Sequence, residues 1–190
     1  MTRIKGFAIR GVLKSIKDSG GSIADLVATL PQAEREVYAR PIVTSDWYPY
    51  PAFVALVRAV DRKQGSGDLA VARDLGRQAA ARDLGATFRI ISAMSSVKFL
   101  LERGNLFWSK YCDRGRMVVD AHEPNTFRGR LEDFPDIDEA HCALIEGWLE
   151  GLGIALGAIG MSTRQAACIR RGDPACEFEG RWTGQRGLLR

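Results

Sequence analysis

Hydrophobic residues recur mostly at helical spacing along the chain, and the alternation typical of strands begins only in its later part. Several segments carry their apolar residues on one helical face, which predicts helices over 4–16, 22–30, 32–39, 52–61, 68–85, 90–101 and 136–158. Alternating positions predict short strands over 117–119 and 126–131 and a β-hairpin over 165–182. This order indicates an α/β (α+β) fold, a mainly helical domain packed on a small antiparallel sheet and closed by the C-terminal hairpin.

The segment 46–51, Asp-Trp-Tyr-Pro-Tyr-Pro, interrupts the helical pattern. Proline lacks the backbone N–H that a helix interior needs, so Pro49 and Pro51 exclude an uninterrupted helix here. The aromatic rings between them carry large apolar surfaces. We therefore expect a loop that packs on the core.

The length of 190 residues lies within the range of one domain and allows a buried core without disulfide bonds. We expect a single domain over 1–190. Its mostly helical part covers 1–115, and the strands, the long helix and the hairpin occupy 116–183. A tail follows over 184–190.

Charge and composition exclude several classes of protein. The net charge of +4 comes from Lys and Arg scattered among acids, without a dense basic block or interleaved aromatic residues, so nucleic acid is not an expected partner. No apolar run is long enough for a membrane span and no signal-peptide pattern opens the chain, which predicts a cytoplasmic protein. Neither a serine-hydrolase elbow, a phosphate-binding glycine loop nor a zinc-protease helix occurs, so we expect no enzymatic activity.

Glycines are unusually frequent in the predicted helix 136–158. Gly147 and Gly151 stand four residues apart, as do Gly153 and Gly157, so each pair shares one helical face. Each glycine costs up to about 1 kcal/mol of helix propensity relative to alanine. A face without side chains lets another backbone approach closely, and we expect such packing either inside the fold or at a homodimer interface.

The hairpin carries two of the four cysteines. Cys176, Phe178 and Trp182 alternate with charged residues and define the inward face of its second strand. Pairing centred on Gly172 places Cys168 opposite Cys176, with Cβ atoms roughly 4.5 to 5.5 Å apart. Two thiols at that distance can share a metal ion, form a disulfide or remain reduced in the core, and reducing conditions favour the metal or the free thiols.

Several short motifs resemble known families. The stretch from Cys168 to Glu179, after a helix that holds Cys142, is similar to the C-terminal end of vinyl-reductase-like domains. Those small α/β modules are related to the effector-sensing domains of phenol- and xylene-responsive transcription activators and to subunits of the TRAPP vesicle-tethering complexes. The chain as a whole resembles a myxobacterial paralogous family of unassigned function, in the motifs Ile4-Lys-Gly-Phe, Asp46-Trp-Tyr-Pro49, Asp74-Leu-Gly-Arg77, Lys110-Tyr-Cys-Asp-Arg-Gly115 and Glu146-Gly-Trp-Leu149.

The resemblance implies a structural zinc site. In the sensor domains a helix cysteine, two hairpin cysteines and a glutamate bind zinc, which points to Cys142, Cys168 and Cys176 here. The glutamate position is Gln165, and a neutral amide is a far poorer zinc ligand than a carboxylate. His141 is the other candidate for the fourth ligand, although neighbouring helical residues point about 100° apart. Three reduced core cysteines are the favoured interpretation, a structural zinc ion is the cofactor that the resemblance implies, and a disulfide is the remaining alternative.

The resemblance also implies a ligand pocket, because the sensor domains and tethering subunits enclose an apolar cavity between helices and sheet. The aromatic residues expected to line it are Trp47, Tyr48, Phe88, Phe99, Phe107, Trp108 and Trp148. We expect a homodimeric sensory or regulatory module that holds a small hydrophobic molecule and signals through a protein partner. The alternative is a homodimeric protein-interaction subunit, similar to TRAPP subunits, without a small-molecule ligand.

Overall fold

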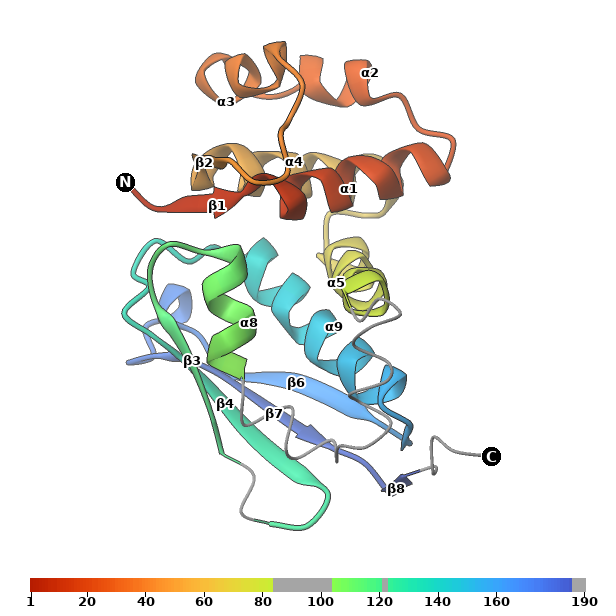
Figure 1. Cartoon of the computed structure of the whole chain (residues 1–190), viewed down its shortest axis with the longest axis vertical. Helices are drawn as coiled ribbons and strands as arrows, with labels where there is room; N and C mark the ends of the chain where they lie inside the picture. Colours follow the sequence, from red (N-terminus) through yellow and green to blue (C-terminus); the bar gives the residue numbers. More distant parts are fainter. Residues whose placement is uncertain (84–103, 121–122, 186–190) are drawn as a thin grey trace.

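The computed structural model describes residues 1–83, 104–120 and 123–185, with helices gathered at one end and an antiparallel sheet at the other (Figure 1). The helices are α1 (Gly6–Asp18), α2 (Ile23–Ala28), α3 (Gln32–Glu36), α4 (Tyr50–Gln64), α5 (Ala70–Asp83), α8 (Gly104–Tyr111) and α9 (Glu139–Ala155), with 3-10 turns η1 (Val37–Ala39) and η2 (Ile169–Arg171). The strands are β1 (Arg3–Lys5), β2 (Trp47–Pro49), β3 (Arg116–Asp120), β4 (Thr126–Glu132), β5 (Ala158–Ile159), β6 (Ser162–Ala167), β7 (Cys176–Arg181) and β8 (Gly184–Gln185). The predicted fold class is confirmed, while the helix predicted over 90–101 lies outside the described residues.

The N-terminal part combines the β1–β2 pair with helices α1 to α4. Because β2 pairs with β1, the expected loop over 46–51 is in part a strand. Pro51 does not break a helix, since it occupies the first turn of α4, where no backbone N–H is needed. The predicted cap of α2 is present, with the N–H of Asp25 donating to Oγ of Ser22 at 3.2 Å.

The first turn of α5 is held by a buried carboxylate from α4. Asp61, only 1% exposed, accepts hydrogen bonds from the N–H groups of Leu69 (2.9 Å), Val71 (3.0 Å) and Ala72 (3.1 Å). Asp68, the cap expected from the sequence, accepts one backbone N–H. The first N–H groups of a helix have no acceptor within it, so Asp61 stabilises α5 and joins it to α4.

We expect Asp61→Ala to lower the free energy of unfolding by about 2 kcal/mol, because it removes the acceptor of three N–H groups at the start of α5. Asp74→Ala is the control, since it removes an exposed carboxylate of α5 that pairs with Arg77 at 2.8 Å. Exposed pairs of this kind contribute less than about 1 kcal/mol. Urea unfolding followed by circular dichroism measures both variants, and equal losses would contradict the role given to Asp61.

The main sheet has four antiparallel strands in the order β3-β4-β7-β6. Its inward face is apolar and includes the buried side chains of Met117, Phe127, Leu131, Cys176 and Phe178. The outer face carries arginine and glutamate side chains, with Glu179 paired to Arg128 at 2.8 Å and to Arg164 at 2.5 Å. Strands β6 and β7 form the predicted hairpin, and Cys176, Phe178 and Trp182 are buried as expected. The first strand ends at Ala167 after a register shift, so Cys168 lies beyond the paired positions and not opposite Cys176 in the ladder.

Helix α9 lies along the inward face of this sheet, and α8 packs on β3 (Figure 1). α9 begins later than position 136, because the carboxylate of Asp138 accepts the N–H of Ala140 at 2.8 Å and so caps the helix. α5 packs along α9 on the side away from the sheet. Within the described ranges, no helix is both long and apolar enough to cross a membrane.

Candidate functional site

A cavity of about 380 Å³ lies among α1, α4, α5, the end of α8 and the start of α9. This volume falls within the roughly 300 to 1,000 Å³ that small-molecule sites occupy. Its apolar lining includes the side chains of Phe7, Phe53, Leu75 and Leu144. Its polar lining consists of Arg10, Lys14, Thr44, Arg82, Asp83, Tyr111 and His141. The cavity therefore combines an apolar interior with a few polar groups.

A second cavity, of about 50 Å³ and almost wholly apolar, lies between α8, α9 and β3. Met117 and Leu149 are among its lining residues. Tyr111, His141 and Leu144 line both cavities, which therefore meet at these three side chains.

Tyr111 is a partly buried residue in the wall that the two cavities share. Its Oη is buried and forms no hydrogen bond within the described part of the chain. The ring centroid lies 4.6 Å from that of Phe7 and 6.3 Å, edge-on, from that of Trp148. A buried polar atom without a partner costs about 1 to 3 kcal/mol. The Tyr111 hydroxyl therefore marks a point at which a ligand atom would be stabilising.

His141 lies beside it, buried on α9 among aromatic rings. Its Nδ1 is 3.0 Å from Oη of Tyr50, an oxygen that also accepts the N–H of Asp138 at 3.2 Å. The Trp108 ring stacks on the imidazole at 5.6 Å between centroids. Desolvation lowers the pKa of His141 to about 4, so the imidazole is neutral at pH 7. In the tautomer whose Nδ1–H donates to Tyr50, Nε2 of the neutral imidazole has a free lone pair for a metal ion.

The seven aromatic residues predicted to line a pocket fall into three groups. The structure places Phe107, Trp108 and Trp148 on the wall of the smaller cavity. Trp47 and Tyr48 lie on β2, where the ammonium of Lys5 is 4.1 Å from the centroid of the Trp47 ring, and neither residue lines these two cavities. Phe88 and Phe99 lie outside the described residues.

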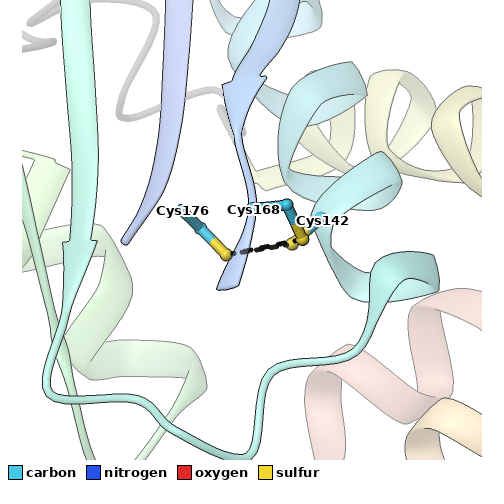
Figure 2. A group of neighbouring side chains, drawn as sticks. All are labelled: Cys142, Cys168 and Cys176. Carbon is cyan, nitrogen blue, oxygen red and sulfur yellow. Dashed lines mark hydrogen bonds between the residues drawn. The ribbon is translucent and has the colours of Figure 1, made fainter. Parts of the chain in front are cut away.

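Three cysteines meet in the core beside the sheet. Figure 2 shows Cys142 from α9, Cys168 from the segment after β6 and Cys176 from the start of β7. Their Sγ atoms all lie within 4.8 Å of one another, with 3.7 Å from Cys142 to Cys176 and 3.9 Å from Cys176 to Cys168. All three are buried free thiols, and Cys112 is a fourth free thiol elsewhere in the core.

Neither candidate for a fourth metal ligand completes this cluster. Gln165 turns its Oε1 towards Arg171 at 3.5 Å, while its amide lies beside Cys142 and opposes the rise in the pKa of that thiol. A neutral amide is a poor zinc ligand. His141 is hydrogen-bonded to Tyr50 instead. The hydrogen bond with Cys176, together with burial, raises the pKa of Cys142 and favours its protonated form. Structural zinc sites almost always have four ligands, so the three thiols lack the fourth ligand that such a site needs.

The glycines of α9 occupy different environments. A Cβ atom at Gly147 would lie 1.8 Å from the carbonyl oxygen of Arg73, and one at Gly151 would lie 2.6 Å from that of Arg77. The first pair therefore faces the backbone of α5. Gly153 faces the side chain of Met161, while Gly157 follows the helix in a left-handed conformation. The structure thus places one pair at a contact inside the fold, and a homodimer remains a prediction.

The sequence gives little indication of the cavity itself. Phe7, Gly11 and Lys14 share one face of α1, but this pattern predicts a helix without showing what lies opposite. Tyr111 follows an aromatic segment and has no motif around it. The sequence around Arg82, at the end of α5, indicates only a solvent-exposed cation. These residues come together only through the packing of α1, α5 and α8.

The fold is that of H-NOX proteins. An H-NOX protein from Shewanella oneidensis in the Fe(II) ligation state is 16% identical with a TM-score of 0.75, over 98% of this chain and 100% of that chain. A mutant H-NOX protein from K. algicida in the Fe(II) unliganded state is 9% identical with a TM-score of 0.70, over 95% and 97%. A structure from work on haem distortion in the H-NOX family is 14% identical with a TM-score of 0.63, over 96% of both chains. No protein-family model and no curated protein matches the sequence.

These structures correct the expected family. The resemblance to vinyl-reductase-like domains, TRAPP subunits and the myxobacterial family is wrong, because the solved structures that share this fold are H-NOX proteins. The motifs that carried the resemblance are short. Their most specific part, a helix followed by an antiparallel hairpin, also lies within the H-NOX alignment, which covers 98% of the chain.

The zinc cofactor that the resemblance implied is also wrong. The H-NOX structures are described by their haem iron, and the thiol cluster has three ligands where a structural zinc site needs four. The same structures are named for haem ligation and not for a reaction, which agrees with the expectation that the chain is not an enzyme.

Proposed function

We propose that this chain is a non-enzymatic sensory domain whose ligand, a haem, lies in the cavity between α1, α5 and α9. The observation that supports it most directly is the buried Oη of Tyr111, which has no hydrogen-bond partner. Tyrosine is one of the few residue types that bind haem iron in proteins. A ligand atom at this hydroxyl would remove the cost of leaving it unpaired.

The other residues of the cavity are compatible with the same group. Haem iron is held by His, Cys, Met or Tyr, and His141 stands beside Tyr111 in the shared wall as a neutral imidazole. The three cations of the cavity, Arg10, Lys14 and Arg82, suit the carboxylates of a porphyrin. When bound, haem supplies an iron at which a diatomic gas can bind, as in the Fe(II)NO form of the S. oneidensis protein.

A chain of contacts leads from the cavity to the core. His141 contacts Tyr50, and Tyr50 accepts the N–H of Asp138 at the cap of α9. The carboxylate of Asp138 pairs with Arg58 of α4 at 2.9 Å. A ligand that moves His141 would therefore act on the junction of α4 and α9. Signalling further requires that the liganded and free forms differ in their affinity for a protein partner.

Titration of the purified full chain with haemin tests this proposal. We expect saturation at one haemin per chain, with a Soret band distinct from that of free haemin. Tyr111→Phe removes the unpaired hydroxyl and should change the spectrum of the complex and weaken binding about tenfold or more, because an iron ligand is lost. Tyr48→Phe is the matched control, since its hydroxyl accepts the N–H of Val43 outside the cavity.

Two results would contradict the proposal. Haemin binding that never saturates would show that the cavity does not hold this group. A Tyr111→Phe complex with the wild-type spectrum and affinity would show that the iron is not held by Tyr111.

A further inference from the structure

Positive charge collects on one side of the cavity. Arg10 and Lys14 stand one turn apart on α1, and Arg82 faces them from the end of α5. Lys14 is already paired with Asp18 at 2.7 Å. Among the described residues, no carboxylate forms an ion pair with Arg10 or Arg82. The charge of these two arginines is therefore available to a ligand.

Arg82 is the better placed of the two, because its guanidinium is partly buried and fixed. Its Nη1 donates to Oγ of Ser15 at 3.2 Å. Gly11 makes room for it, since a Cβ atom there would lie 3.2 Å from Nη2. One hydroxyl acceptor leaves most of the five guanidinium N–H donors free. Such a group binds a planar carboxylate through two parallel hydrogen bonds.

Asp83, the acidic residue next to the Arg82 guanidinium, has its own hydrogen-bond partner. Asp83, the neighbour of Arg82 on α5, accepts the indole N–H of Trp148 at 3.0 Å. Burial raises the pKa of Asp83, and the Arg82 charge opposes that rise. Asp83 also lines the cavity, but its carboxylate is bonded to the indole of α9 and forms no ion pair with Arg82 among the described residues.

The apolar part of the cavity lies at the other end of the same helix face. Phe7 contacts the Tyr111 ring, and Ser15 marks the position of Arg82 along α1. Eight residues of helix separate Phe7 from Ser15, which is roughly 12 Å along the axis. The cavity is therefore polarised, with aromatic rings at one end and a guanidinium at the other.

We infer that the cavity selects its ligand by a carboxylate, which Arg82 binds while an apolar body of roughly 10 Å extends towards Phe7 and Tyr111. This inference rests on the proposed function, since it requires that the cavity holds a ligand. The recognised chemistry, a carboxylate on an apolar body, is shared by a porphyrin and by a fatty acid. The uncharged esters and alcohols of the same size lack it.

Two pairs of probes separate these possibilities on the full chain. Haemin is compared with haemin dimethyl ester, and dodecanoate with dodecanol, by tryptophan fluorescence and isothermal titration. We expect at least one acid to bind about tenfold more tightly than its neutral counterpart, as for one hydrogen-bonded ion pair. Arg82→Gln should abolish that preference, so that acid and neutral probe bind with equal affinity. Arg82→Lys keeps the charge but not the paired donors and should keep part of the preference. Arg40→Gln, an exposed arginine outside the cavity, is the control.

Each outcome supports or overturns a stated claim. Equal affinities for acid and neutral probes, or an Arg82→Gln protein that keeps the preference, would overturn the inference while the cavity still binds ligands. Binding of dodecanoate but not of haemin would keep the inference and remove haem as the source of the carboxylate. A folded protein that binds none of the four probes would overturn the proposed function, and the inference with it.

Discussion

Gly147→Ala should lower the free energy of unfolding by about 3 kcal/mol, although alanine is the better helix former. The added Cβ would lie 1.8 Å from the carbonyl oxygen of Arg73, an atom of the α5 backbone that no side-chain rotation can move. α5 and α9 would have to separate, and Gly76, whose Cβ position is 1.9 Å from the carbonyl oxygen of Leu144, would lose the same contact from the other side. Because α5 also lines the cavity, ligand affinity should fall with stability.

Gly153→Ala is the matched control on the same helix. Its Cβ would meet the side chain of Met161 at 2.8 Å, and that flexible chain can turn aside. The gain in helix propensity then offsets the contact, so the change in the free energy of unfolding should stay within about 1 kcal/mol. Urea unfolding of both variants measures the difference. If Gly147→Ala unfolds at the urea concentration of the wild type, the close contact of α5 and α9 is contradicted.

Acid should destabilise the domain through His141. The folded-state pKa of about 4 lies below the ordinary value of 6.5, because burial disfavours the charged imidazole. Between these two pH values the unfolded chain binds a proton that the folded chain does not, so stability rises with pH through this window and is lost as pH falls. The whole effect amounts to about 3 kcal/mol, at about 1.4 kcal/mol per pKa unit.

Urea unfolding at pH 7 and pH 4.5 measures this dependence. His141→Gln cannot take up a proton, so its free energy of unfolding should fall less on acidification. It keeps a polar group beside Tyr50 but loses the ring contacts, so it should be less stable than the wild type at pH 7. The difference between the wild-type and variant pH dependences isolates His141 from the carboxylates that titrate in both. Parallel pH dependences would mean that His141 is not a buried neutral group.

The α9 glycines show how far the sequence predicts this fold. Spacing of four placed Gly147 and Gly151 on one face and predicted a close backbone contact. The partner could not be predicted, because nothing in residues 70–83 beyond Gly76 marks α5 as the helix that approaches. Local patterns specify which face is bare, and packing between distant segments decides what covers it.

The cysteines and the cavity differ in the same way. Alternation along 176–182 predicted which face of the hairpin is inward, and the thiols of Cys168 and Cys176 do meet there. The zinc ion that the resemblance implied was wrong, because three thiols without a fourth ligand are also a stable apolar core. The Tyr111 hydroxyl escaped prediction entirely, since its lack of a partner depends on α1, α8 and α9 together.

The measurement that tests the central claim most directly is native mass spectrometry of the full chain mixed with equimolar haemin. A cavity that holds this ligand predicts one added haem per chain, reduced in the Tyr111→Phe protein but not in Tyr48→Phe. A folded chain that keeps its unliganded mass with haemin would contradict the account.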